Sequence, residues 1–506
     1  MSGLDLAAML EEHARRWRDR PAVLEMESGR GHDYAAFAGR VRRLAGWLDA
    51  AGVKPGDRVV WLGQNSHCVL ELLIAAGRLG AALAILNWRQ SEDELRFVLD
   101  DLDPQVVVWQ PDSLPDTLRA EWRERSCTWL RQDSLDPACD YETAIAGAPE
   151  AEAAAAMPSD APQLLLYTAA FSGRPAAAIL TRQALVLQAL HYAALRGWNH
   201  ATTYLSATPL FHVATLLDCL ATFVVGGRNL FVRQADPADM CAIIAAEKVS
   251  DTFILPPTME KILELGDGRP DLGSLRSQPY KPEWNALVTI DDSLWGKRPY
   301  GYGQTETMGY ATFSALGDPG KGGMGRPSPL VRLAMLDEEG RELPDGEVGE
   351  IGVRGWTVSP GYWRRPEINA QRYTADGWRR TNDLGRRESD GTLSFIGPKG
   401  RLIKSAAENI YPAEVERCIA QIDGVAEVAV IGTPDPVWMQ SVRAIVVAKP
   451  GMAIDEAAVI DHCRRTIASY KKPRSVVFAD ALPRAGAAID YAALDRLYEG
   501  GGYPSG

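Results

Sequence analysis

Residues 301–307, GYGQTET, combine a backbone and side chains that suit a phosphorylated nucleoside. Gly301 and Gly303 permit close approach of the backbone, and the ring of Tyr302 offers a flat face to a base. Gln304 and Thr305 offer hydrogen-bond donors to a phosphate oxygen. A glycine-rich turn with polar caps explains such a segment better when it stands alone, so the nucleotide interpretation depends on the motifs around it.

Residues 167–182, YTAAFSGRPAAAILTR, follow a short apolar run at 164–166 and have the strand-and-turn outline of a phosphate-binding loop. Gly173 and Pro175 punctuate the turn. A loop that holds a polyphosphate uses bare backbone N–H groups, hydroxyl donors and usually a lysine. The positions that would supply these groups are occupied by Ala169, Ala170, Phe171 and Ala176. The loop therefore has the outline of a triphosphate-binding loop but lacks its hydroxyl donors and its lysine.

Both segments resemble motifs of the adenylate-forming superfamily, which includes acyl-CoA synthetases, peptide-synthetase adenylation domains and luciferases. The loop is similar to the family signature YTSGTTGxPKG, and further matches recur in order along nearly all 506 residues. The resemblance implies that Thr305 contacts an α-phosphate and is catalytic, and that Glu306 occupies a magnesium-associated position.

The segment GWRRTNDL at 377–384 is similar to the family motif GWxxTGDL, with Asn382 in place of glycine. Asp383 is then expected to accept hydrogen bonds from both ribose hydroxyls, because a carboxylate is an acceptor only; an exposed turn aspartate is the alternative. Pro398 stands where the family has a ribose-binding arginine, and Arg401 is expected to replace it. The implied nucleotide-binding residues are Gly301, Tyr302, Gly303, Gln304, Thr305, Asp383 and Arg401.

The run PLFHVATL at 209–216 places His212 among apolar residues. A histidine of this kind is often a core residue, but the resemblance places it in the acyl pocket and near the thioester-forming centre, with a catalytic role. Residues 253–257, FILPP, are expected to form a strand that enters a helix at 258–265 and walls this pocket. The expected acyl-pocket residues are Phe211, His212, Val213, Gly301 and Gly303.

Residues 397–416 are similar to the family pattern GRxKDxIKxxGxNIYPxEVE, which implies a tunnel for the pantetheine arm of CoA. Its expected lining is Ala406, Ala407, Glu408, Asn409 and Tyr411. The basic residues Lys471, Lys472 and Arg474 either meet CoA phosphates or form a solvated surface patch. The segment LPRAGAAID at 482–490 carries Ala488 where the family has the lysine that bridges carboxylate and α-phosphate during adenylation.

The missing lysines and loop donors affect the two half-reactions of the family differently. Forming an acyl-adenylate from ATP depends on positioned electrostatic donors; losing one typically costs about 10²–10³ in rate, and here two lysine positions and several loop donors are gone. Attack of the CoA thiol on the adenylate requires only that AMP, the acyl chain and the thiol be positioned. We therefore expect an acyl-CoA ligase that performs thioesterification alone, transferring the acyl group of a preformed acyl-adenylate to CoA with release of AMP.

This division of labour resembles that of non-adenylating acyl-CoA ligases in platensimycin and platencin biosynthesis. It implies a secondary-metabolism enzyme whose bulky diterpenoid acyl group arrives as an adenylate made by a separate adenylating ligase. The expected cofactors are CoA and the AMP moiety of the acyl-adenylate, with no metal site and no productive use of ATP or magnesium. Two alternatives remain: a complete ATP-dependent acyl-CoA synthetase whose losses are compensated or engineered, and a non-catalytic protein that binds AMP or acyl-adenylate.

The elements that position these residues follow from the hydrophobic pattern. Helices are expected at 34–50, 67–79 and 91–99, the last with Ser91 and Glu94 spaced as a capping box. The strands between them, at 57–63, 81–86 and 105–109, predict an α/β fold with a largely parallel, doubly wound sheet. Residues 111–160 are expected to form a surface excursion.

The resemblance adds a β-rich subdomain and a small, mobile α+β C-terminal domain. The expected division is a large N-terminal domain at 1–397 with the acyl and AMP pocket, a hinge at 398–402, and a small domain at 403–506. The net charge of −12 argues against nucleic acid and anionic membranes as partners. With seven scattered cysteines, no signal peptide and no long apolar run, a cytoplasmic location is expected.

Overall fold

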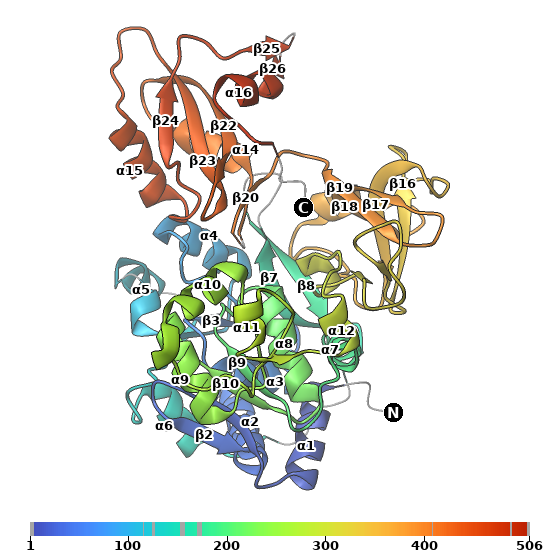
Figure 1. Ribbon diagram of the computed structural model, residues 1–506. Helices are drawn as coiled ribbons and strands as arrows, with labels where there is room; N and C mark the ends of the chain where they lie inside the picture. The colour runs from blue at the N-terminus through green and yellow to red at the C-terminus, as the bar shows by residue number, and fades with distance from the viewer. Residues whose placement is uncertain are drawn as a thin grey trace.

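The computed structural model describes residues 5–114, 116–123, 127–151, 157–168, 175–406, 408–485 and 488–502. It confirms the expected fold class: a large mixed α/β N-terminal domain carries a β-rich subdomain, and a small C-terminal domain lies above both (Figure 1). Ala169, Ala170, Phe171 and Ala407 lie outside the described residues.

A six-stranded sheet forms one layer of the large domain. Its order is β6-β5-β3-β4-β7-β8, parallel except for the last pair. Alternate residues of β3 enter different cores: Val59 and Trp61 face the central core, and Val60 and Leu62 the outer one, as the two-residue period of a strand requires. Its strands are β3 (Arg58–Leu62), β4 (Ala82–Ile85), β5 (Val106–Trp109), β6 (Thr128–Arg131), β7 (Pro162–Thr168) and β8 (Ala176–Thr181). Because β6 completes the edge of this sheet, residues 111–160 are more than a surface excursion.

A five-stranded sheet forms the second layer, in the order β11-β9-β10-β1-β2. All its pairs are parallel except β1 with β2. Its strands are β1 (Pro21–Glu25), β2 (Arg30–Asp33), β9 (Thr203–Ser206), β10 (Arg228–Phe231) and β11 (Asp251–Thr252).

Helices fill the space between the two sheets and cover their outer faces. Every residue of α3 from Cys68 to Gly77 is buried, because this helix packs within the central core. The prediction for residues 34–50 is confirmed to the residue, and the capping box of Ser91 and Glu94 is present at α4. The helices of this domain are α1 (Leu6–Arg16), α2 (Tyr34–Ala50), α3 (Cys68–Arg78), α4 (Glu92–Leu102), η1 (Pro111–Ser113), α5 (Asp116–Arg123), α6 (Asp140–Gly147), α7 (Arg182–Arg196), α8 (Val213–Val224), α9 (Pro237–Glu247) and α10 (Pro256–Glu264).

The predicted strand at 253–257 is wrong. The strand is β11, which ends at Thr252, and Phe253 and Leu255 are exposed. Leu255 is the N-cap of α10, which starts at Pro256 because proline suits the first turn of a helix. The divergent segment that follows folds into short elements: η2 (Gly266–Gly268), β12 (Arg276–Ser277), α11 (Pro282–Asn285), β13 (Thr289–Ile290) and α12 (Leu294–Lys297).

The β-rich subdomain, drawn at the right of Figure 1, is an antiparallel sheet in the order β16-β17-β18-β19. Asn382 within β18 has a φ of 63°, and asparagine is among the few residues that adopt this left-handed conformation readily, so it can stand in for the family's glycine. The elements here are η3 (Thr305–Thr307), β14 (Thr312–Phe313), β15 (Arg326–Pro327), β16 (Val331–Leu336), β17 (Val348–Gly355), α13 (Pro366–Arg372), β18 (Arg379–Arg387) and β19 (Leu393–Pro398).

The small domain has a separate core beneath its own five-stranded sheet. The sheet runs β21-β20-β23-β22, with β24 parallel to β23. Its elements are β20 (Ile403–Ser405), β21 (Glu408–Ile410), α14 (Pro412–Ile419), β22 (Val425–Asp435), β23 (Met439–Ala448), α15 (Glu456–Thr466), β24 (Ser475–Phe478), β25 (Arg484–Ala485), β26 (Ala488–Ile489) and α16 (Tyr491–Leu497).

A buried ion-pair cluster joins the small domain to the large one. The ammonium of Lys471 lies 2.7 Å from carboxylate oxygens of both Glu94 in α4 and Glu414 in α14. The expectation of a solvated patch is therefore wrong for Lys471, since its charge is buried and already paired. Lys471 also lines the cavity described below, and its contact with CoA stays a prediction. Ser91 adds a hydrogen bond from its hydroxyl to the carbonyl oxygen of Thr466, at 2.9 Å.

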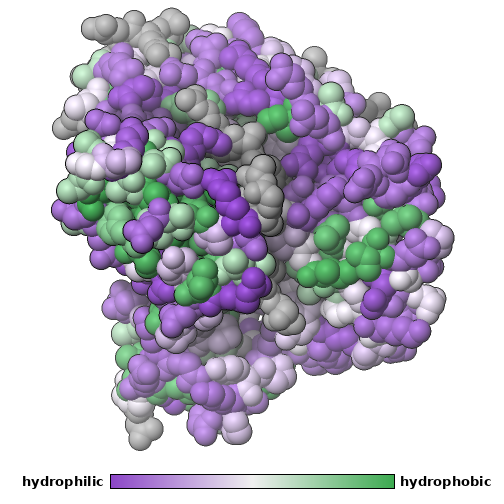
Figure 2. Space-filling view, turned by 90° about the horizontal axis from the view of Figure 1, so that it is seen from above, coloured by the Kyte–Doolittle hydropathy of each residue, from purple (hydrophilic) through white to green (hydrophobic). Residues whose placement is uncertain are grey.

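Within the described ranges, every helix is too short or too polar to span a membrane. Seen from above, the surface is mostly hydrophilic, and its hydrophobic side chains form separate patches (Figure 2).

Candidate active site

A cavity of about 420 Å³ lies where the large domain, the β-rich subdomain and the small domain meet. The large domain contributes the ends of β4 and β7 and the start of α8, while the small domain contributes the strand pair β20 and β21. Of the residues selected from sequence, the cavity is lined by Phe211, His212, Gly301, Tyr302, Gly303, Gln304, Thr305, Asp383, Glu408, Asn409 and Tyr411. Motifs more than 200 residues apart in sequence thus share one site.

Three selected residues do not reach this cavity. Val213 begins α8 and packs against the central core. The guanidinium of Arg401 lies over the ring of Tyr491, 3.6 Å from its centroid, and points toward Asp495 in the small domain. Ala406 follows β20 with a φ of 50°, and its N–H donates to the carbonyl oxygen of Trp438.

The two positions of lost lysines that can be placed lie in β8 and β26. Ala176 is the first residue of β8 and is buried in a small apolar cluster with Ala178 and Tyr362. Ala488 belongs to β26, whose partner β25 lies at the far side of the small domain in Figure 1.

Gly301 and Gly303 are required by their packing against residues 309–312. A Cβ on Gly303 would lie 1.6 Å from the carbonyl oxygen of Gly309, and one on Gly301 would lie 2.2 Å from that of Thr312. Any side chain at either position would therefore displace the neighbouring backbone. The two glycines are therefore required by the packing of the chain against itself, and a close approach of the nucleotide to them stays a prediction.

Asp383 lies at one end of the cavity and is already hydrogen-bonded. Its Oδ2 accepts from the hydroxyl of Tyr302 at 2.8 Å and from Nε2 of Gln304 at 2.7 Å. Burial raises the pKa of Asp383 to about 6, against these two hydrogen bonds, which lower it. The ring of Tyr302 stacks on Phe395. A ligand that binds here meets a carboxylate whose charge state changes near neutral pH.

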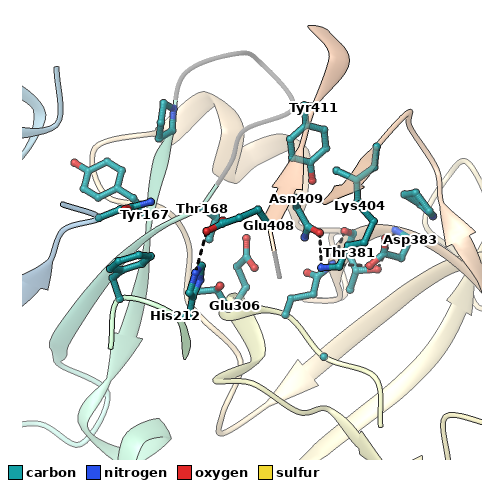
Figure 3. Close-up of a pocket in the computed structure, with 18 of the residues that line it drawn as sticks. Tyr167, Thr168, His212, Glu306, Thr381, Asp383, Lys404, Glu408, Asn409 and Tyr411 are labelled. Carbon is teal, nitrogen blue, oxygen red and sulfur yellow. Dashed lines mark hydrogen bonds and ion pairs between the residues drawn. The ribbon is translucent and has the colours of Figure 1, made fainter. Parts of the chain in front are cut away.

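At the opposite side, His212 and Glu408 bring the two domains together. His212 is the N-cap residue of α8, and Glu408 begins β21 in the small domain. Nε2 of His212 lies 3.2 Å from Oε1 of Glu408, and Figure 3 shows the two side chains pointing at each other. Burial would raise the pKa of Glu408, but the hydrogen bond from His212 and the charges of His212, Arg89 and Lys404 hold it below its usual range.

Lys404 lies on the small-domain side of the cavity. Its Nζ donates to Oδ1 of Asn409 at 2.9 Å, as Figure 3 shows. Burial lowers the pKa of Lys404, while the charge of Glu408 raises it and only partly offsets that effect. The small domain therefore presents a carboxylate, an amide and an ammonium to the same space.

Glu306, at the magnesium-associated position, is engaged by two neighbours. The hydroxyl of Tyr362 donates to Oε1 of Glu306 in a short hydrogen bond. Nη2 of Arg379 lies 3.1 Å from the same oxygen and donates to the hydroxyl of Tyr362 at 2.8 Å. Burial alone would lower the pKa of Arg379, but the charge of Glu306 raises it above its ordinary value.

Arg379, Tyr362, Lys404 and Tyr470 line the cavity without having been selected from the sequence. Arg379 stands in the segment GWRRTNDL, in which the sequence assigned roles only to Asn382 and Asp383, and Tyr362 stands in GYW at 361–363. A doubled arginine after a buried tryptophan was the available signal for Arg379. Its partner Glu306 is 73 residues away, so the pairing itself had no local signature.

A second polar cluster lies in the core, apart from the cavity. Ring nitrogens of His32 and His67 and a carboxylate oxygen of Glu71 lie within 4.8 Å of one another. Arg40 donates to both carboxylate oxygens of Glu71, at 2.5 and 3.2 Å, and Tyr141 donates at 2.8 Å. Because a guanidinium already neutralises the carboxylate, the arrangement is that of a buried ion-pair network.

Comparison with known proteins agrees with this architecture. Residues 10–363 match the model of the AMP-binding enzyme family, and residues 414–488 match that of the AMP-binding enzyme C-terminal domain. The chain is 35% identical over 488 residues to a feruloyl-CoA synthase of Amycolatopsis sp, covering 93% of this chain and 95% of that protein. It is 31% identical over 521 residues to an indoleacetate–CoA ligase of Aromatoleum aromaticum, covering 95% of each.

A solved structure extends the likeness to three dimensions. ATP-bound MatB from Rhodopseudomonas palustris superposes with a TM-score of 0.68 at 28% identity, over 98% of this chain and 99% of that one. Sequence, fold and the meeting of both domains at one cavity agree, and the chain belongs to the AMP-binding enzyme family, in the acyl-CoA ligase branch of the adenylate-forming superfamily.

Proposed function

We propose that this acyl-CoA ligase performs the thioester-forming half-reaction alone, converting a preformed acyl-adenylate and CoA into acyl-CoA and AMP. One observation carries the proposal. The small domain presents Glu408 and Asn409 to the cavity, where Glu408 meets His212.

Thioester formation from an acyl-adenylate requires one bond to form and one to break. A C–S bond forms between the thiol sulfur and the acyl carbon, and the bond between that carbon and the phosphate oxygen of AMP breaks. The oxygen leaves with the bonding electron pair, as AMP. When Nε2 of His212 donates to Glu408, Nδ1 keeps its lone pair and accepts the thiol proton, which generates the nucleophilic thiolate.

The losses in the adenylation machinery support the same proposal. Ala176 is buried against Ala178 and Tyr362, so this position offers no cation for a polyphosphate. AMP needs less, since Asp383 can accept from a ribose and Thr305 can donate to a phosphate. The acyl group then reaches this protein as an adenylate made by a separate adenylating ligase, and a bulky diterpenoid acid is the acyl group that the sequence resemblance favours.

The relatives' names favour a second function, a complete ATP-dependent acyl-CoA synthetase. The two functions are separated by two mixtures, one of feruloyl-adenylate with CoA and the other of ferulic acid, ATP, magnesium and CoA; a diterpenoid acid and its adenylate form a second pair. We expect acyl-CoA, detected by mass spectrometry, to form at least about 10³-fold faster from the adenylates. Comparable rates from acid and ATP would contradict the proposal.

If the protein only binds nucleotide, a third result is expected. Calorimetry would then detect binding of AMP, and neither mixture would form acyl-CoA.

A further inference from the structure

Arg379 presents unused hydrogen-bond donors at the wall of the cavity. The residue begins β18, and its side chain is 2% exposed. Nη2 contacts Glu306 and Tyr362, whereas Nε and Nη1 are buried without a hydrogen-bond partner among the residues that the structure describes. Because a buried donor without a partner costs free energy, these two nitrogens are suited to an acceptor supplied by a ligand.

The residues at the magnesium-associated position do not fit that ion. Magnesium binds carboxylate oxygens at about 2.0–2.1 Å in a strict octahedral arrangement. Oε1 of Glu306 already accepts from Tyr362 and lies 3.1 Å from a guanidinium nitrogen. A divalent cation on this oxygen would displace the hydrogen bond from Tyr362, and on either oxygen of Glu306 it would be repelled by the charge of Arg379.

We propose that Arg379, one of several cations that line this site, binds through its guanidinium the α-phosphate of the acyl-adenylate and of the AMP that remains after transfer. The guanidinium suits this task because it is always charged and carries several N–H donors in a fixed plane. Glu306 and Tyr362 hold it through Nη2, and Nη1 and Nε, which point to different sides of the group, each keep an N–H that can donate to the anion. The identity of that anion rests on the proposed function.

A fixed internal cation also explains how magnesium can be dispensed with. An arginine neutralises the single negative charge on the phosphate of an acyl-adenylate, which is a mixed anhydride of a carboxylic acid and AMP. The β- and γ-phosphates of ATP would bring further negative charge to a loop whose lysine position is Ala176. The cation therefore matches the adenylate better than the triphosphate.

The test compares AMP with adenosine, which lacks the phosphate, by calorimetry on the full chain. In EDTA, wild-type protein is expected to bind AMP more tightly than adenosine, and magnesium chloride leaves the ratio unchanged. Arg379→Gln is expected to weaken AMP binding about 10- to 100-fold, the range of a charged hydrogen-bond pair, while adenosine binding stays within about twofold.

Arg380→Gln is the matched control, because it removes the same charge one position along β18. Arg380 pairs with Glu350, 2.9 Å away, and does not line the cavity, so the AMP-to-adenosine ratio should stay at the wild-type value. If Arg379→Gln fails to fold because Glu306 loses its partner, the double variant Glu306→Gln with Arg379→Gln removes both charges and should show the same loss of phosphate preference.

Three results would overturn the proposal: no phosphate preference in the wild type, an unchanged ratio in the Arg379 variants, or a wild-type AMP affinity that rises more than tenfold with magnesium. The binding readout does not depend on turnover. If the Arg379 variants lose the preference for AMP over adenosine but the wild type forms no thioester, the role of Arg379 is upheld and the proposed function is rejected. If the wild type forms thioester but the variants keep that preference, the proposed function is upheld and the role of Arg379 is rejected.

Discussion

Nε2 of His212 in the large domain lies 3.2 Å from Oε1 of Glu408 in the small domain. The contact joins the start of α8 to the start of β21 across the cavity, and it exists only while the two domains are closed on each other in this orientation. The hydrogen bonding of His212, the proton acceptor that we propose, therefore depends on the position of the small domain.

Replacement of His212 by asparagine is expected to lower CoA-dependent release of AMP from an acyl-adenylate by about 10²–10⁴, the usual contribution of a general base. AMP affinity should be unchanged, because His212 is assigned to the thiol. The measurement is single-turnover thioester formation. His200→Asn is the control, since His200 is exposed and stacks on Trp17; an equal loss in both variants would contradict the assignment.

Replacement of Lys471 by methionine is expected to destabilise the closed arrangement of the domains. It leaves the carboxylates of Glu94 and Glu414 buried side by side, and breaking a buried pair in this way typically costs about 3–5 kcal/mol. Proteolysis at 398–402, the predicted hinge, should accelerate. Lys472→Met is the control, because Nζ of Lys472 only meets Ser469 at the surface; unchanged proteolysis of the Lys471 variant would show that the cluster does not hold the domains.

Binding of adenosine is expected to weaken as the pH falls from 7 to 5. Burial raises the pKa of Asp383 to about 6, so the carboxylate is ionised above that value and accepts hydrogen bonds, and is protonated below it. Adenosine is the probe, since a phosphate monoester itself titrates at a pKa of about 6. Asp383→Asn should bind weakly at every pH; a pH dependence that persists in this variant would exclude Asp383 as its source.

The ion-pair network of Arg40 and Glu71 is expected to stabilise the fold above acidic pH. Burial would raise the pKa of Glu71, but Arg40 and His67 lower it to about 2. A carboxyl whose pKa is depressed in the folded state contributes stability above its ordinary pKa and loses it as the pH falls toward 2. Glu71→Gln should therefore lower the free energy of unfolding at pH 7 by about 3–5 kcal/mol.

Urea unfolding at pH 7 and pH 4 measures this effect. Glu12→Gln, which removes an exposed partner of Arg15, should change stability by less than about 0.5 kcal/mol. Equal effects of the two variants would show that the buried network adds nothing.

The sequence predicted those parts of the molecule that depend on local signals. The helix at 34–50 and the cap at Ser91 follow from side chains within a few residues of each element, and the structure has both. Retained motifs also predicted that Tyr302, Asp383 and His212 would share a cavity, because each is recognisable without its neighbours.

The remainder depended on partners that are distant in the chain. In the sequence, nothing distinguishes Arg379 from a surface arginine, because its partner Glu306 is far away in the chain. Lys471 reads as part of a basic patch until Glu94, 377 residues away, is found to bind it. Arg401 was expected at the nucleotide, but it lies over Tyr491 in its own domain, since a pattern match fixes position in sequence and leaves side-chain direction open.

The buried position of Lys471 bears on how the protein releases what it makes. Swinging the small domain away would expose the ammonium and both carboxylates to solvent, where hydration replaces the attraction that each loses. The cost of desolvating buried charges can exceed their mutual attraction. The ion pairs of Lys471 would therefore specify the orientation in which the two domains meet while adding little to the free energy needed to separate them.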